Sequence, residues 1–104
     1  MGLRHALLAG DFRVASSVVE DETIRFVLRR SQVGEPRPTA REQQVLELAV
    51  EGQSNKAIGI TLGVPPSRVS ESLRRVAHKL GARSWVTLLP LIAGIEEEGP
   101  SRTR

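Results

Sequence analysis

Hydrophobic residues recur at helical spacing through the second half of the chain. Between residues 66 and 80 they are spaced by four, three and four positions, and the resulting stripe consists of Val69, Leu73, Val76 and Leu80. Two shorter segments, about 40–51 and 55–62, also place their apolar residues on one side, and residues 85–92 are apolar on more than one side. The pattern therefore predicts four helices between residues 37 and 95, the third of which spans Pro66–Leu80.

Residues with helix-capping chemistry mark the ends of the first three predicted helices. Thr39 and Glu42 have the spacing of a capping box, in which the Thr hydroxyl caps the helix while the Glu side chain reaches back. Ser54 can cap the second helix in the same way. Gly52 and Gly81 follow the first and third helices, where glycine commonly ends a helix.

The fourth predicted helix is too apolar to be buried along a single stripe. Ser84 is its candidate N-cap, and Pro90 is expected to bend or end it. One apolar face packs on the first and third helices, and the surplus forms either a dimer contact or a seat for the N-terminal region. The residues assigned to this packing or dimer surface are Trp85, Leu88, Leu89 and Ile92.

The first 36 residues follow a different pattern, in which apolar and other residues alternate. The alternating positions are Phe12, Val14, Ser16 and Val18 in one segment, and Ile24, Phe26 and Leu28 in the next. Acidic residues 20–22 between them suit a turn, so the pattern predicts a β-hairpin, with a helix as the alternative. A short helix is expected at residues 3–9. Because an isolated hairpin is marginal in water, this one must pack on the helical region or on its copy in a second chain.

A linker of two prolines, a glycine and no apolar residue, residues 34–38, separates the two patterns. We expect an N-terminal arm of residues 1–36, a helical domain of residues 37–95 and a polar tail of residues 96–104. The predicted fold class is mainly α, a C-terminal four-helix bundle preceded by a short β-hairpin.

Within the bundle, the second and third helices are joined by a short glycine-containing turn at residues 63–65. This arrangement is typical of a helix-turn-helix, which presents the outer face of its second helix to the major groove of DNA. Gly59 lies inside the first of the two helices, where it costs about 1 kcal/mol relative to Ala. We expect it there because the two helices approach closely.

Composition excludes several classes of protein. The chain has 104 residues and no cysteine, which excludes disulfides, thiolate metal sites and a Cys nucleophile. No metal ligand set, catalytic constellation or glycine-rich phosphate loop is present, so no enzyme activity and no cofactor are expected. The apolar runs are far shorter than the roughly 20 residues that cross a bilayer, and no signal peptide is recognisable. We expect a cytoplasmic protein without a membrane partner.

Charge is spread unevenly along the chain. Residues 1–36 contain five arginines and five acidic residues, whereas residues 37–95 contain eight basic and four acidic residues. Five of these basic residues lie between positions 68 and 83 with a single acidic residue, Glu71. Such a basic helix is typical of a surface that contacts nucleic-acid phosphates, and the alternative is a solvated helix face.

The run from residue 39 to residue 84 resembles the LuxR/GerE-type helix-turn-helix domain of bacterial transcription regulators. The shared motifs are the opening Thr39-x-Arg41-Glu42, the run Gly52-x-Ser54-Asn55-Lys56 and the ending Lys79-Leu80-Gly81. The resemblance implies a four-helix DNA-binding domain whose third helix reads the major groove and whose fourth helix often dimerises.

The chain departs from this family pattern around the third helix. Pro65 stands where members usually have Ser, so the helix loses its side-chain cap. Ser70 and Ser72 replace a Lys that usually contacts DNA and a His. Arg68 restores a positive charge near the missing Lys.

A helical wheel separates the candidate DNA contacts into two groups. Steps of 100° from the buried stripe place Ser67, Glu71, Arg74 and His78 on the opposite side of the third helix. The residues expected near base edges are Ser67, Ser70, Glu71 and Arg74, and those expected near phosphates are Ser54, Asn55, Lys56, Arg68, Arg75 and Lys79. Arg41 is expected to be a surface or intradomain ion-pair residue, and His78 a solvated helix residue.

The sequence therefore predicts a transcription regulator that reads the major groove of double-stranded DNA with helix Pro66–Leu80, as a dimer. One alternative is an interaction module with weak DNA affinity that pairs with a full-length regulator or the transcription machinery. Another is a module resembling region four of a sigma factor, which would act with RNA polymerase. The Gly-x-Ser-Asn-Lys and Lys-Leu-Gly runs favour the LuxR type. Residues 1–36 are too few for a complete sensory or receiver domain.

Overall fold

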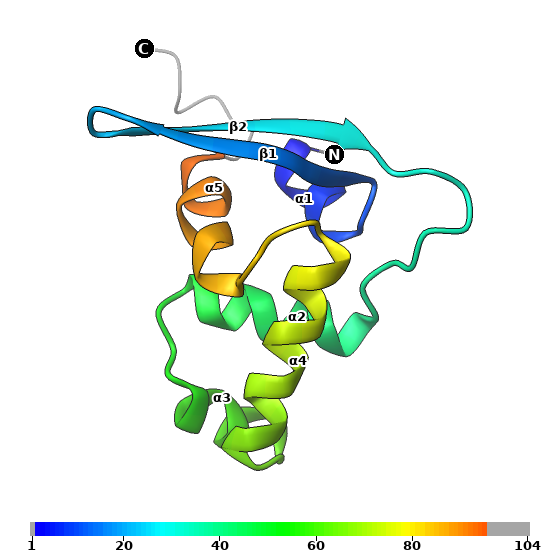
Figure 1. Cartoon of the computed structure of the whole chain (residues 1–104). Helices are drawn as coiled ribbons and strands as arrows, with labels where there is room; N and C mark the ends of the chain where they lie inside the picture. The colour runs from blue at the N-terminus through cyan, green and yellow to red at the C-terminus, as the bar shows by residue number, and fades with distance from the viewer. Residues whose placement is uncertain (1, 96–104) are drawn as a thin grey trace.

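The computed structural model describes residues 2–95, and the predicted polar tail, residues 96–104, lies outside the described residues. A β-hairpin lies across one end of a group of helices (Figure 1). The elements are α1 (Leu3–Leu8), β1 (Phe12–Glu20), β2 (Thr23–Arg30), α2 (Ala40–Val50), α3 (Asn55–Leu62), α4 (Pro66–Lys79), the 3-10 helix η1 (Trp85–Thr87) and α5 (Leu88–Gly94). The predicted class, mainly helical with an N-terminal hairpin, is confirmed. Within residues 2–95 no helix combines the length and the hydropathy that a membrane span needs.

The predicted caps position α2 and α3. Thr39 Oγ1 accepts a hydrogen bond from the Glu42 N–H at 3.1 Å, and Glu42 Oε1 accepts one from the Thr39 N–H at 2.9 Å. This confirms the capping box. Ser54 Oγ accepts from the Ala57 N–H at 3.1 Å and caps α3 as predicted. Both helices therefore begin at the residues that their side-chain chemistry indicates.

Gly59 makes a close contact, but with a different partner from the one predicted. A Cβ atom at this position would lie 2.5 Å from the carbonyl oxygen of Val64 and 3.5 Å from the nitrogen of Pro66. The close neighbour is thus the backbone of the turn and the first residue of α4, and not the body of that helix. Glycine allows the turn between α3 and α4 to be tight.

The predicted fourth helix forms as two pieces. Residues 85–87 are a 3-10 helix, and the α-helix begins only at Leu88. The Ser84 side chain makes no capping hydrogen bond, and Thr87 Oγ1 instead donates to the Ser84 carbonyl at 2.7 Å. Pro90 lies in the first turn of α5, where a backbone N–H has no partner within the helix, so it is tolerated there. The predictions of a Ser84 cap and of a helix that ends at Pro90 were wrong.

The hairpin confirms the predicted strands but not the whole predicted alternation. The two strands pair antiparallel, and an irregularity in the register between Val14 and Ser16 places an extra residue in β1. Beyond this bulge Ser17 pairs with Phe26, whereas Ser16 pairs with Val27. Directly paired residues lie on the same face of a sheet, so Ser17, and not Ser16, shares the face of Phe26. The predicted alternation was therefore wrong from Ser16 onward.

The arm packs on the helical region of its own chain. The Val14 N–H donates to the Leu80 carbonyl at 2.8 Å, which joins β1 to the end of α4. Gly81 has a φ of +82°, and a Cβ atom there would lie 2.5 Å from the Val14 carbonyl oxygen. Gly81 therefore both ends α4 and lets the strand approach.

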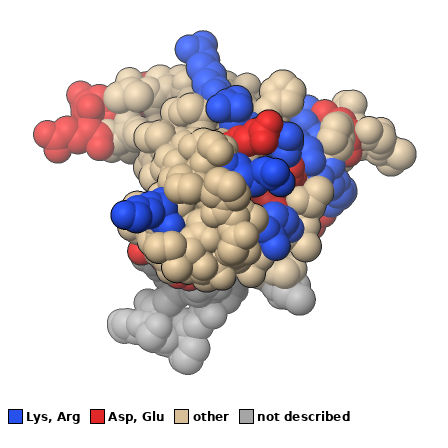
Figure 2. All heavy atoms as spheres, turned by 90° about the horizontal axis from the view of Figure 1, so that it is seen from below, with Lys and Arg blue, Asp and Glu red and all other residues tan. Residues whose placement is uncertain are grey.

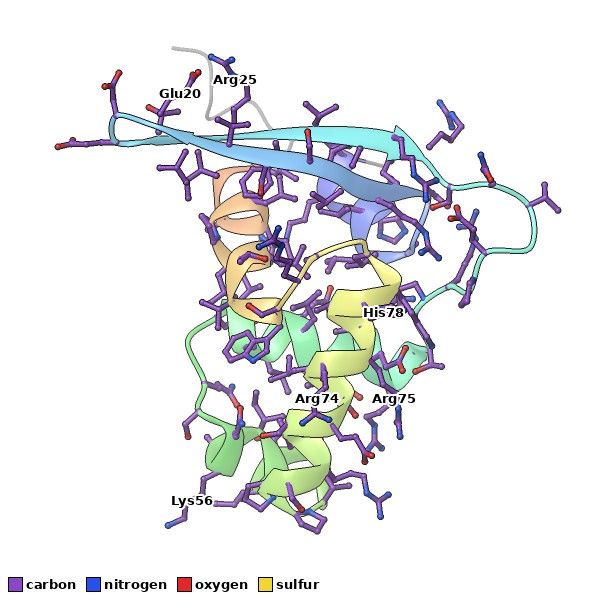
Figure 3. All side chains as sticks on the ribbon, viewed as in Figure 1. Glu20, Arg25, Lys56, Arg74, Arg75 and His78 are labelled. Carbon is purple, nitrogen blue, oxygen red and sulfur yellow. The ribbon has the colours of Figure 1, made fainter. Side chains whose placement is uncertain are left out.

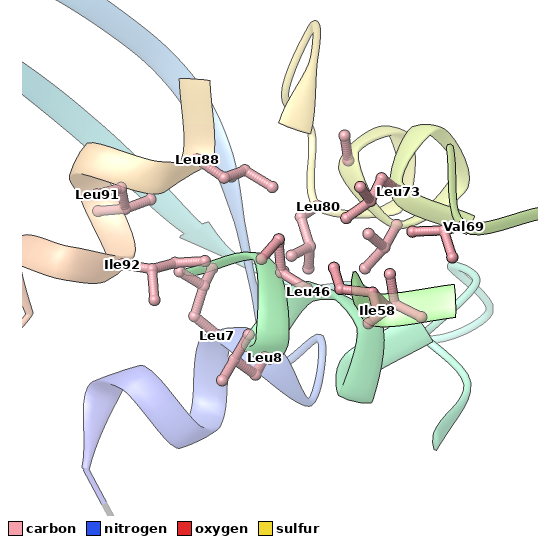
Figure 4. Close-up of a cluster of buried hydrophobic side chains, with 14 residues drawn as sticks. Leu7, Leu8, Leu46, Ile58, Val69, Leu73, Leu80, Leu88, Leu91 and Ile92 are labelled. Atoms are coloured by element: carbon pink, nitrogen blue, oxygen red, sulfur yellow. The ribbon is translucent and has the colours of Figure 1, made fainter. Parts of the chain in front are cut away.

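One hydrophobic core joins the arm to the helices. The buried cluster includes Leu7 and Leu8 of α1 together with residues of α2, α3, α4 and α5 (Figure 4). Figure 4 labels Leu46, Ile58, Val69, Leu73, Leu80, Leu88, Leu91 and Ile92 from the helices. Burying a side chain of this size contributes about 1.5–3 kcal/mol. The partly buried Phe12, Val14, Phe26 and Leu28 of the hairpin pack against the same cluster.

Candidate nucleic-acid interface

α4 begins at the end of the molecule that the hairpin does not cover and runs toward the hairpin (Figure 1). One face of the helix carries Val69, Leu73 and Val76, which are completely buried against α2 and α3. The polar side is open: Ser67, Arg68, Arg74, Arg75 and His78 are exposed, and Ser70 and Glu71 are half-buried. The helical wheel therefore separates the buried and open sides correctly.

Arg74 stands on the open face without an ion-pair partner among the described residues (Figure 3). Figure 3 shows it on the viewer's side of α4, with Arg75 leaving the helix in another direction and His78 one turn further along. Its guanidinium group can therefore reach a partner outside the chain without first breaking an internal contact.

An ion pair joins Glu71, which was expected near bases, to Arg75, which was expected near phosphates. Arg75 Nη2 lies 3.2 Å from Glu71 Oε2, and both side chains are about half exposed at 56% and 47%. The four-residue spacing on one helix explains the contact. An exposed pair of this kind is weak, contributing about 0.3–0.5 kcal/mol, so either group can exchange it for another partner.

A hydrogen bond joins Asn55, which was expected near phosphates, to Ser70, which was expected near base edges. Asn55 Nδ2 donates to Ser70 Oγ at 2.8 Å, across the turn between α3 and α4. The bond links the start of α3 to the middle of the exposed helix. Fifteen residues separate the partners, so helical spacing alone gave no signal for it.

Two further residues at the start of α3, Ser54 and Lys56, were expected to contact phosphates, and only one of them has no partner among the described residues. The Ser54 hydroxyl is exposed at the edge of the helix and already serves as its cap. Lys56 is exposed and lies at the lower end of the molecule in Figure 3, with no ion-pair partner within residues 2–95. Of these two, Lys56 has the free positive charge.

Lys79 lies inside the domain rather than on the exposed face. Its Nζ donates to Glu42 Oε1 at 2.8 Å, and only 21% and 6% of the two side chains are exposed. Burial alone would raise the pKa of Glu42, but the hydrogen bonds from Lys79 and from the Thr39 N–H outweigh it and lower that pKa. Lys79 thus forms an ion pair between α2 and α4, and its contact with a phosphate stays a prediction.

The start of α4 confirms the loss of a side-chain cap. Pro65 holds the N-cap position and offers no side-chain hydrogen bond. Its carbonyl accepts from the N–H groups of Arg68 at 2.9 Å and Val69 at 3.2 Å, while Pro66 has no N–H to satisfy. In this described turn, only the N–H of Ser67 is left without an acceptor. Two prolines therefore reduce the need for the cap that the sequence lacks.

Most arginines of the arm and linker form ion pairs, whereas most of those described in the helical domain do not. The ion pairs of the arm and linker are Arg13 and Arg29 with Glu35, Arg25 with Glu20, and Arg37 with Asp11. In contrast, Arg41, Arg68, Arg74 and Arg83 have no ion-pair partner in the part of the chain that the structure describes. Figure 2, seen from the α3 end, shows basic side chains mostly gathered on one side, with acidic side chains between several of them. The surplus positive charge is thus available to an external anion.

The apolar residues after α4 divide between the core and the surface. Leu88 and Ile92 are fully buried in the core cluster. Trp85 and Leu89 are half-buried, and Val86 is 54% exposed. Of these five residues, Trp85, Val86 and Leu89 retain a surface that a second chain can touch.

Two helices joined by a tight turn, packed on a preceding helix and exposing a basic face on the second, define a helix-turn-helix protein. The comparison with known families matches residues 39–91 to the family described as bacterial regulatory proteins, luxR family. The chain therefore belongs to the LuxR family, whose members are DNA-binding transcription regulators, and the resemblance seen in the sequence is confirmed. No curated protein and no solved structure was found to match the chain.

Proposed function

We propose that this protein regulates transcription by inserting the exposed face of α4 into the major groove of double-stranded DNA. The observation that carries the proposal is the position of Arg74, which is exposed in the middle of that face and unpaired within the described residues. The major groove admits an α-helix, and an arginine in it can donate two hydrogen bonds to guanine. The hairpin covers the other end of the molecule, so it does not obstruct this approach.

In this arrangement the open face divides into base and phosphate contacts. Ser67 and Arg74 meet base edges, and Glu71 can accept from a cytosine amino group when Arg75 turns to a phosphate. Ser70 also lies close to the bases, and its hydroxyl keeps the hydrogen bond from Asn55. The phosphate contacts are Ser54, Asn55, Lys56, Arg68 and Arg75, because they flank the open face. Lys79 is left to its internal ion pair.

Fluorescence anisotropy with labelled duplexes tests the proposal, after selection of preferred sequences from a random pool. Wild-type protein should bind with an affinity that falls steeply with salt. Arg74→Ala should lose about 1–3 kcal/mol on the selected sequence and relax the preference at one base position. Arg25→Ala is the matched control, because Arg25 pairs with Glu20 at the far tip of the hairpin (Figure 3). Binding that is absent or insensitive to salt would contradict the proposal and favour the interaction module.

We also propose that two copies bind DNA together through the apolar surface formed by Trp85, Val86 and Leu89. The exposure of Val86 beside two half-buried apolar side chains supports this choice. Leu89→Glu and Val86→Glu should each lower the mass measured by analytical ultracentrifugation from a dimer to a monomer, because a charge is costly to bury. A wild-type monomer in the presence of a two-site duplex would contradict the dimer and leave DNA binding by single copies intact.

A further inference from the structure

A second basic feature lies beside the open face of α4, in a hollow between the first turn of α2 and the N-terminal half of α4. The hollow has a volume of about 240 Å³. Three arginines line it, Arg41 of α2 and Arg68 and Arg75 of α4. Liquid water occupies about 30 Å³ per molecule. The hollow is several times larger than that, so it has room for a phosphate group.

The inner side of the hollow is formed by buried groups. Val45 and Val69 line it and are almost completely buried, as is Ser72, which is 7% exposed. Apolar neighbours weaken the screening by water and strengthen the attraction between a guanidinium group and an anion. An anion in the hollow would thus be held more firmly than one on an open helix surface.

The charges around the hollow leave a positive surplus. Its lining also includes Glu42, but that carboxylate already accepts hydrogen bonds from Lys79 Nζ and from the Thr39 N–H. Glu71 is paired with Arg75. Arg41 and Arg68 form no ion pair among the described residues, although Arg41 was expected to be a surface or intradomain ion-pair residue.

We infer that this hollow binds a phosphate group of the DNA backbone, held between Arg41 from one side and Arg68 and Arg75 from the other. The inference rests on the proposed function and adds α2 to the DNA-contacting elements. Planar guanidinium groups match phosphate oxygens with paired hydrogen bonds, which a lysine ammonium group cannot reproduce. A free phosphate ion has the same chemistry, and the experiment must separate the two sources.

The salt dependence of duplex binding tests the inference with three variants. Each phosphate that a protein neutralises contributes about −0.9 to the slope of log affinity against log salt. Arg41→Ala should therefore reduce the magnitude of the slope by about 0.9 without changing the sequence preference. Arg41→Lys should keep the slope but bind more weakly. Arg83→Ala is the matched control, since Arg83 is exposed, has no ion pair within residues 2–95 and follows α4 at the hairpin end.

Failure of this inference is distinguishable from failure of the proposed function. If wild-type protein binds duplex DNA and Arg41→Ala keeps the full slope, the hollow holds no backbone phosphate while α4 still reads DNA. If wild-type protein shows no salt-dependent binding, the proposed function itself is wrong. Circular dichroism should show the same folded signal for both Arg41 variants, because the Arg41 side chain is exposed.

Inorganic phosphate alone distinguishes the two sources of the anion. In nuclear magnetic resonance spectra of the free protein, amide shifts at Val45 and Val69 should change only when duplex DNA is added. Saturable shifts at millimolar inorganic phosphate that disappear in Arg41→Ala would instead assign the hollow to a free phosphate ion, and would overturn the backbone assignment.

Discussion

Arginines at the two ends of the molecule have opposite environments. At the hairpin end Glu35 binds two of them, and the side-chain hydrogen bond from Arg29, with a second from the Gln32 N–H, lowers the pKa of Glu35 to about 2. At the α3 end Arg68 and Arg74 project from α4 with no carboxylate partner among the described residues. The difference shows how a chain with a net charge of only +3 can still present unpaired arginines at one end, because the other end pairs most of its own.

Apolar residues are buried in the shared core and exposed at both tips of the molecule. Leu80, Leu88 and Ile92 are completely buried where the arm meets the helices, whereas Val19 near the hairpin tip is 71% exposed and Ile60 in α3 is 75% exposed. Substitutions in the shared core should therefore lower stability, whereas substitutions on the exposed face of α4 should affect DNA binding.

Leu88→Ala is expected to have the largest effect on stability. The fully buried side chain would leave a cavity in the shared core, at a cost of about 2–5 kcal/mol in the free energy of unfolding. Ile60→Ala, at the α3 end, should change it by less than about 0.5 kcal/mol. Urea unfolding followed by circular dichroism measures both values, and equal losses would contradict the contrast between the shared core and the exposed surface of α3.

Gly81→Ala should weaken the contact between the hairpin and α4. A non-glycine residue in the left-handed region costs about 1–2 kcal/mol, and here the new Cβ would also lie 2.5 Å from the Val14 carbonyl oxygen. Gly52→Ala is the matched control, because Gly52 also has a positive φ but no atom within 4 Å of the added Cβ.

Both glycine variants are compared by urea unfolding, and hydrogen exchange of the Val14 amide reports on the hairpin itself. Gly81→Ala should be the less stable of the two, and exchange at Val14 should accelerate only in that variant. Unchanged exchange would mean that the strand stays docked in spite of the added methyl group.

Glu42→Gln should give the smallest loss, and one that depends on pH. The pKa of Glu42 is lower in the folded protein than its ordinary value of 4.5. Its charge therefore stabilises the fold above the unfolded pKa, and this contribution is lost as the pH falls through the folded pKa. At pH 7 the variant should lose about 1 kcal/mol.

The difference between wild type and Glu42→Gln should shrink as the pH is lowered below about 4. Glu35 also contributes to stability, and this contribution is lost as the pH falls toward about 2. The loss is the same in wild type and in Glu42→Gln, so it does not affect their difference. Glu47→Gln, at an exposed position of α2, should differ little from wild type at either pH. If Glu42→Gln is still less stable than wild type by the same amount at pH 3, the loss comes from altered packing or hydrogen bonding and not from the missing charge.

Local signals in the sequence predicted the helices well. The Thr39–Glu42 box and the Ser54 cap act within a few residues, and the bounds of α3 were found without error. The bulge in β1 was missed, since nothing in the Val14–Ser17 run distinguishes an extra residue from regular alternation. Ser84 was misread as a cap because the segment after it first forms a 3-10 turn stabilised by Thr87.

The candidate site was predictable only in part. Periodicity identifies the exposed face of α4, because it follows from the buried stripe on the same helix. It says nothing of bonds between elements, so the contacts of Lys79 with Glu42 and of Asn55 with Ser70 were not foreseen. Arg41 was set apart from the DNA contacts for the same reason: only the packing of α2 against α4 brings it beside Arg68.

The insertion of Leu7 and Leu8 into the core of the helices has a consequence for cooperativity. The composition of residues 34–38 suggests a boundary between the arm and the helices, but the buried cluster contains residues from both sides of it. The arm and the helices are therefore expected to unfold in a single transition. A fragment that begins at the linker would lack Leu7 and Leu8 of this cluster, and it would be a poor substitute for the intact chain in studies of DNA recognition.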